Sequence, residues 1–75
     1  MYQEIPIGEI IKQKLTEHDR SISWLAKKVN LDSSNFLKKL NHNNIELELL
    51  FRISKILQED FFAHCSQLFQ GGKLP

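Results

Sequence analysis

The sequence predicts an all-α fold of five short helices. Apolar residues recur at spacings of three and four along most of the 75-residue chain, and no segment alternates as a strand would. Apolar residues make up 41% of the chain and charged residues 25%, which are ordinary values for a globular domain. We therefore expect one domain over residues 1–70 and a flexible tail over 71–75, since Gly71-Gly72 ends the last helical pattern.

The first two helices are predicted from periodicity and from the residues at their ends. Residues 7–17 form the first helix, and Pro6 suits a helix start. Residues 22–29 form the second helix, because Ser21 is a good N-cap. Asn30 tolerates the left-handed conformation that ends helices, so it marks the end of the second one.

The remaining three helices follow from the same signals. The third runs to about Leu40 and is capped by Asp32 or Ser33. A polar segment with poor helix formers, residues 41–44, then separates it from the next helix. The last two helices cover residues 47–57 and residues 61–69, the latter capped by Asp60.

The charge of the chain is unevenly distributed. The net charge is only +1, but residues 12–40 hold seven basic and three acidic side chains, a local net charge of +4. Both ends of the chain are mildly acidic. A localised basic surface is typical of proteins that bind a polyanion.

Several classes of protein are disfavoured. Cys65 is the only cysteine, which excludes an internal disulfide and fits a reducing, cytoplasmic location. No segment has the length of a membrane span or the pattern of a signal peptide. His18, His42 and His64 lack the spacing of a metal site, and His64 and Cys65 point about 100° apart on a helix. We expect no enzyme activity, no metal and no cofactor.

Residues 21–40 carry the strongest functional signal. Two helices are joined there by the three-residue connection Asn30-Leu31-Asp32, which forces them to cross steeply. Ala26 is small enough for a close approach, and Phe36 packs the third helix onto the second. This is the pattern of a helix-turn-helix.

Four short motifs occur in an order and at spacings that are specific together: Ser-Trp-Leu-Ala-Lys-Lys (23–28), Ser-Asn-Phe (34–36), Leu-Leu-Phe-Arg-Ile-Ser-Lys-Ile-Leu (49–57) and Asp-Phe-Phe (60–62). Through these motifs the chain resembles the lambda-repressor/Cro-like (XRE-type) helix-turn-helix regulators, especially small members from Bacteroides-type bacteria. The resemblance covers roughly residues 7–66 and implies a compact five-helix DNA-binding domain whose third helix, about 33–40, enters the major groove. It implies a sequence-specific regulator of transcription, most simply a repressor.

The residues themselves predict a reading face on the third helix. Ser34, Lys38 and Asn41 form a polar stripe opposite Phe36, and such side chains hydrogen-bond to base edges and phosphates. The start of the second helix offers free backbone N–H groups to a phosphate. The predicted DNA contacts are Ser21, Ser23, Lys27, Lys28, Ser33, Ser34, Asn35, Leu37, Lys38, Asn41, His42 and Asn43.

The sequence departs from the family pattern at three positions. Ile22 stands where relatives often have Gln, and Asn30 replaces the usual Gly of the turn. Lys39 lies where relatives place an apolar core residue. Either its stem passes along the core while the ammonium reaches water, or Leu40 takes over the packing.

A second apolar stripe predicts a partner. Leu47 and Phe51 lie opposite the core-facing side of the fourth helix. A homodimer that uses Phe51, the last helix and Trp24 would read a palindromic operator. The alternative is that the last helix folds over this stripe and hides it. A protein-interaction module, antitoxin-like or anti-repressor-like, is the second hypothesis for function. The predicted interface residues are Trp24, Phe51, Phe61, Phe62, Cys65 and Phe69.

Overall fold

A computed structural model describes residues 5–71, and this part of the chain contains five α-helices and no strand. The predicted all-α class is confirmed. The boundaries of α1 and α4 agree with the prediction, while α2 ends one residue earlier and α3 and α5 run further. Helix α5 includes residue 71, the first residue of the predicted tail, and residues 72–75 lie outside the described part, so the flexible tail stays a prediction. The helices are α1 (Ile7–Glu17), α2 (Ile22–Lys28), α3 (Ser33–Asn41), α4 (Leu47–Leu57) and α5 (Phe61–Gly71).

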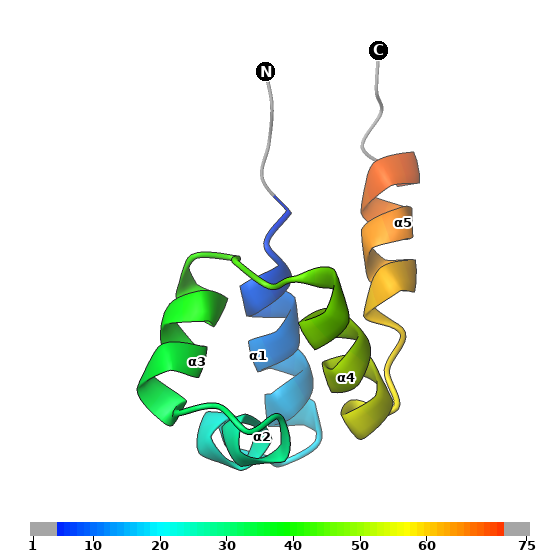
Figure 1. The fold of residues 1–75 in the computed structure, drawn as a ribbon. Helices are drawn as coiled ribbons and strands as arrows, with labels where there is room; N and C mark the ends of the chain where they lie inside the picture. The colour runs from blue at the N-terminus through cyan, green and yellow to red at the C-terminus, as the bar shows by residue number, and fades with distance from the viewer. Residues whose placement is uncertain (1–4, 72–75) are drawn as a thin grey trace.

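The first four helices surround a common core, and the fifth extends away from it. Figure 1 shows α3 and α4 on either side of α1, with α2 across the lower end. Helix α3 packs on both α1 and α2, whereas α5 packs on α4. The chain measures 41 × 22 × 21 Å because the far end of α5 stands clear of the other helices (Figure 1).

The core joins apolar residues from all five helices. Phe36 and Phe61 are its two largest members, and both are 0% exposed. The prediction that Phe61 belongs to a dimer interface was therefore wrong, because this side chain closes the core where α5 begins. The other fully or almost fully buried side chains are Ile11, Leu15, Leu25, Ala26, Leu40 and Ile53.

The start of α1 touches the end of α3 without an intervening side chain. A Cβ added to Gly8 would lie 1.8 Å from the carbonyl oxygen of Leu40, closer than any real contact. The Gly8 N–H also donates a hydrogen bond of 2.9 Å to Oδ1 of Asn43. Only glycine leaves room for this close approach of the two backbones. The contact therefore sets the position of α3 on α1.

Ionisable side chains gather around Glu59, where the start of α5 meets the end of α1. The Glu59 carboxylate lies 3.7 Å from Nζ of Lys14, 3.9 Å from Nε2 of His18 and 3.7 Å from Nε2 of His64. The predicted cap of α5 is confirmed, since Asp60 Oδ1 accepts a 3.0 Å hydrogen bond from the Ala63 N–H. These contacts fix the first turn of α5.

We predict that Gln58→Gly stabilises the protein by about 0.5–1 kcal/mol. Gln58 ends α4 with φ 53°, a left-handed conformation in which its Cβ is strained and glycine is not. Urea denaturation of the two proteins measures the difference. Asn30→Gly is the matched control, because Asn30 has φ 58° but asparagine tolerates that conformation, so its gain should be smaller. Equal gains would contradict this explanation.

Candidate nucleic-acid interface

Side-chain caps define where α2 and α3 begin. Ser21 Oγ accepts a 3.0 Å hydrogen bond from the Trp24 N–H, as expected for an N-cap. Asp32 Oδ2 accepts from the N–H groups of Ser34 at 3.1 Å and Asn35 at 3.3 Å. Asp32 is therefore the cap of α3, which settles the choice that the sequence left open.

The connection between α2 and α3 is held by the core. Asn30 takes φ 58°, so the chain turns sharply after α2, as predicted. Val29 is buried and Leu31 half-buried at the corner, while Ala26 and Phe36 are 0% exposed where the two helices meet. This packing fixes the angle between α2 and α3 and leaves one side of α3 in solvent.

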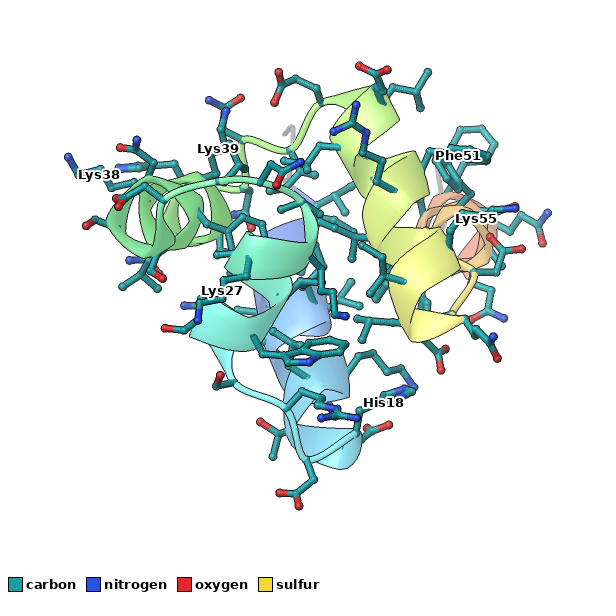
Figure 2. The ribbon with its side chains drawn as sticks, turned by 60° about the horizontal axis from the view of Figure 1, so that its bottom comes forward. His18, Lys27, Lys38, Lys39, Phe51 and Lys55 are labelled. Atoms are coloured by element: carbon teal, nitrogen blue, oxygen red, sulfur yellow. The ribbon has the colours of Figure 1, made fainter. Side chains whose placement is uncertain are left out.

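The exposed side of α3 carries the predicted polar stripe. Ser34, Lys38 and Asn41 are all exposed, opposite the buried Phe36. Figure 2 shows Lys27 of α2 and Lys38 of α3 projecting from the same side of the molecule. The predicted contact residues that are exposed are Ser21, Ser23, Lys27, Lys28, Ser33, Ser34, Asn35, Leu37, Lys38, Asn41 and His42.

Hydrogen bonds within the protein already use some of the predicted contact groups. Asn43 is half-buried and its Oδ1 accepts the Gly8 N–H, which gives it a structural role, while its DNA contact stays a prediction. The Ser33 hydroxyl lies 3.3 Å from that of Ser23 and links the starts of α2 and α3. The Ser21 hydroxyl caps α2, which leaves it less free for a phosphate.

Lys12 of α1 belongs to this surface, although the sequence pattern did not point to it. Its Nζ lies 2.6 Å from Oδ1 of Asn41, the last residue of α3. The carboxylate of Glu9, which lies one turn earlier in α1, is 3.7 Å from the same ammonium. The two partners Lys12 and Asn41 are 29 positions apart, so only the packing of α1 on α3 reveals the contact.

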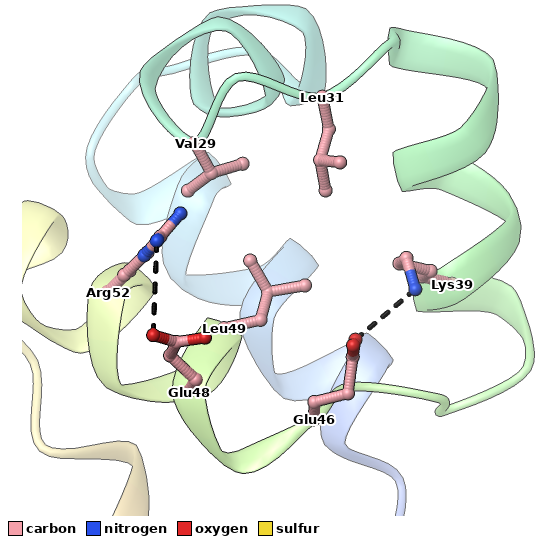
Figure 3. A pocket seen from close by; sticks show the side chains of 7 residues that line it. All are labelled: Val29, Leu31, Lys39, Glu46, Glu48, Leu49 and Arg52. Atoms are coloured by element: carbon pink, nitrogen blue, oxygen red, sulfur yellow. Dashed lines mark hydrogen bonds and ion pairs between the residues drawn. The ribbon is translucent and has the colours of Figure 1, made fainter.

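A shallow pocket of about 250 Å³ lies between α3, the α2–α3 connection and the first half of α4 (Figure 3). Lys39 Nζ is 3.2 Å from Glu46 Oε1 across its mouth, and Arg52 lies 4.0 Å from Glu48. Leu40 is 2% exposed, so it supplies the core packing while Lys39 keeps its ammonium at the surface. The pocket is lined by Val29, Leu31, Lys39, Glu46, Glu48, Leu49 and Arg52.

We predict that the Lys39–Glu46 pair weakens in acid. The hydrogen bond from Lys39 lowers the pKa of Glu46 below its ordinary value of 4.5. A carboxyl group with a lowered pKa stabilises the fold above its unfolded pKa, and this contribution is lost as the pH falls through the folded pKa. Carbon-detected NMR titration of Glu46 should show that lowered pKa, and Lys39→Met should return it towards 4.5. An unchanged pKa in the variant would contradict the pairing.

Apart from the buried Phe61, the residues predicted for a dimer interface fall into three groups. Phe51 is 54% exposed and Phe69 68%, so both are available to a partner. Phe62 and Cys65 are half-buried against the core. Trp24 is also half-buried, and two cations cover its ring: Arg20 lies 4.6 Å and Lys28 5.6 Å from the ring centroid.

The apolar residues left exposed lie mainly on the pair of helices α4 and α5. Leu47 is 73% exposed and Leu68 43%, in addition to Phe51 and Phe69. Helix α5 therefore does not hide the second stripe of α4. Figure 2 shows Phe51 on the opposite side of the molecule from Lys27 and Lys38. The polar and apolar surfaces can accordingly be occupied at the same time.

Comparison with protein-family models, curated proteins and solved structures gives no match to this chain. Within residues 5–71, no group of three or more His, Cys, Asp or Glu side chains is placed to hold a metal ion. No helix in this range is long and apolar enough to cross a membrane. The geometry of the α2–α3 surface is therefore the basis for a functional proposal.

Proposed function

We propose that the protein is a cytoplasmic, sequence-specific double-stranded DNA-binding regulator of transcription, most simply a repressor, of the lambda-repressor-like helix-turn-helix type. One observation carries this proposal: α3 presents a stripe of hydrogen-bonding side chains while its opposite side is locked into the core by Phe36. A helix held in this way can be inserted into the major groove as a rigid unit.

The groups on this surface divide into base readers and phosphate contacts. The exposed Asn35 amide suits the edge of an adenine, and Lys38 suits a guanine or a phosphate. Leu37 is 39% exposed and suits a thymine methyl group. Lys27 and Lys28 lie at the end of α2 and supply phosphate contacts, which position the protein without reading sequence.

Chemical-shift mapping with a random-sequence DNA duplex tests the proposed surface. We expect the amide signals of α3 and of the start of α2 to shift, and the shifts to shrink steeply as salt is raised, because phosphate binding releases counterions. Shifts confined to α4 and α5, or none at all on a folded protein, would contradict the proposal.

We further propose that the protein forms a homodimer through the apolar surface of α4 and α5. A dimer would place two copies of α3 about one DNA turn apart on a palindromic operator. The supporting observation is the exposure of four large apolar side chains on these helices: Leu47, Phe51, Leu68 and Phe69.

We predict that Phe51→Ser and Phe69→Ser shift the protein towards monomer in sedimentation equilibrium. Removing a large apolar side chain from the centre of an interface reduces the favourable free energy of dimerisation by about 1–2 kcal/mol, which weakens the dimer roughly tenfold. Leu37→Ser is the control, since it removes exposed apolar surface from α3 instead. A parent protein that stays monomeric above about 100 µM would contradict the dimer.

The same exposed residues favour the second candidate function, a protein-interaction module. Leu47 and Phe69 are 73% and 68% exposed, which is unusual for large side chains of a small monomer. In that case a different protein, rather than a second copy, would cover α4 and α5. Absence of DNA binding by a monomeric parent would favour this function over the regulator.

A further inference from the structure

We infer that Lys12 is a positioning residue that turns the Asn41 amide so that its NH₂ donor points away from Lys12 and towards a ligand. This inference rests on the proposed function and gives one position of the interface a defined specificity. Asn41 sits at the exposed end of α3, and Lys12 reaches it from α1. The two side chains form one unit although they come from different helices.

The orientation of the Asn41 amide follows from the chemistry of its partner. The Lys12 ammonium lies 2.6 Å from Oδ1 of Asn41. An ammonium has three N–H donors and no acceptor, so only the amide oxygen can face it. The NH₂ group of Asn41 must then point away from Lys12. Because Lys12 is half-buried beside α3, this orientation is set before any ligand arrives.

The orientation limits what Asn41 can recognise. Bidentate pairing of an asparagine with adenine uses the amide oxygen as acceptor and the NH₂ as donor. In Asn41 the oxygen faces Lys12, whose ammonium also lies 3.7 Å from Glu9, and the NH₂ is the group that points away from Lys12. The Asn41 amide therefore presents a donor, and a target that offers acceptors suits it. Guanine N7 and O6 in the major groove, and the oxygens of a phosphate, share this chemistry.

Asn35 provides the contrast on the same helix. It takes part in the cap of α3 through its backbone N–H, which donates to Asp32. Its side-chain amide is exposed near the start of α3 and can turn to offer both a donor and an acceptor. The two asparagines of the reading face therefore differ in how they are oriented: the Asn35 amide is free to pair with adenine, and the Asn41 amide is turned so that its NH₂ donor favours an acceptor.

The positioning role can be tested without DNA. In the free protein, Lys12→Met should move the side-chain NH₂ signals of Asn41 in a ¹⁵N spectrum, while Lys12→Arg, which keeps a donor, should restore them. Lys38→Met is the matched control, since Lys38 is an exposed lysine of α3 that should leave those signals in place. Asn41 signals that do not respond to Lys12→Met would overturn the inference, whatever the protein binds.

Binding-site selection with the parent and Lys12→Met then identifies the target. Loss of a guanine preference at one position, with roughly tenfold weaker binding to the parent's site, supports reading of guanine. Weaker binding to all sequences, with a salt slope reduced by about 1, supports a phosphate. An unchanged selected site, affinity and salt slope would overturn the inference. Failure of the parent to bind any DNA would instead refute the proposed function, leaving the spectroscopic test to judge the positioning role.

Discussion

Gly8→Ala is expected to destabilise the protein by about 3 kcal/mol or more, which is a large part of the stability of a domain this small. The added Cβ would lie 1.8 Å from the backbone oxygen of Leu40 and 2.6 Å from its carbonyl carbon. Backbone atoms cannot rotate away as the end of a side chain can, so α1 and α3 must separate. The same shift breaks the hydrogen bond from the Gly8 N–H to Asn43.

Urea denaturation followed by circular dichroism measures this effect. The control is Gln13→Ala, an exposed position in the same helix, which should change stability by less than about 0.5 kcal/mol. Because Gly8 supports the end of α3, a folded Gly8→Ala protein should also bind DNA less well. A variant as stable as the parent would show that α1 and α3 do not meet as described.

Asn35→Ala combined with Lys38→Ala is expected to abolish most specific DNA binding while leaving the fold intact. Both side chains are exposed on α3, and removing one that reads a base should cost about 1–3 kcal/mol of binding free energy. The two substitutions together should cost at least as much as either one alone, and the size of the sum measures how far these neighbouring side chains act together. Fluorescence anisotropy with a selected DNA site measures the change.

Lys55→Ala is the matched control for this double variant. Lys55 is an exposed lysine of α4 and projects from the opposite side of the molecule (Figure 2). Its removal changes the net charge as Lys38→Ala does, so any difference between them reports position rather than charge. Equal effects of Lys38→Ala and Lys55→Ala would show that α3 is not the reading helix.

The helices were predictable because their signals are local. Apolar spacing placed α1 and α4 at their observed bounds, and short polar side chains marked the starts of α2 and α5. The left-handed Asn30 likewise follows from its own preference. The end of α5 was predicted two residues too early, because the helix continues through Gln70 to Gly71.

The tertiary contacts were not predictable, because they depend on how helices distant in sequence approach each other. Helical spacing places Phe61 and Phe69 on one apolar face of α5, yet Phe61 is buried and Phe69 is 68% exposed. The difference arises because only the first turns of α5 lie over the core (Figure 1). The contacts of Lys12 with Asn41 and of Gly8 with Asn43 span 29 and 35 positions, beyond any periodic pattern.

Selection of binding sites from a random double-stranded DNA library, at two salt concentrations, tests DNA reading by α3 most directly. We expect an enriched palindrome whose half-sites lie about ten base pairs apart, with weaker recovery at the higher salt. No enrichment at either salt concentration, with a protein shown to be folded, would contradict DNA reading by α3 and leave the apolar surface of α4 and α5 as the functional site.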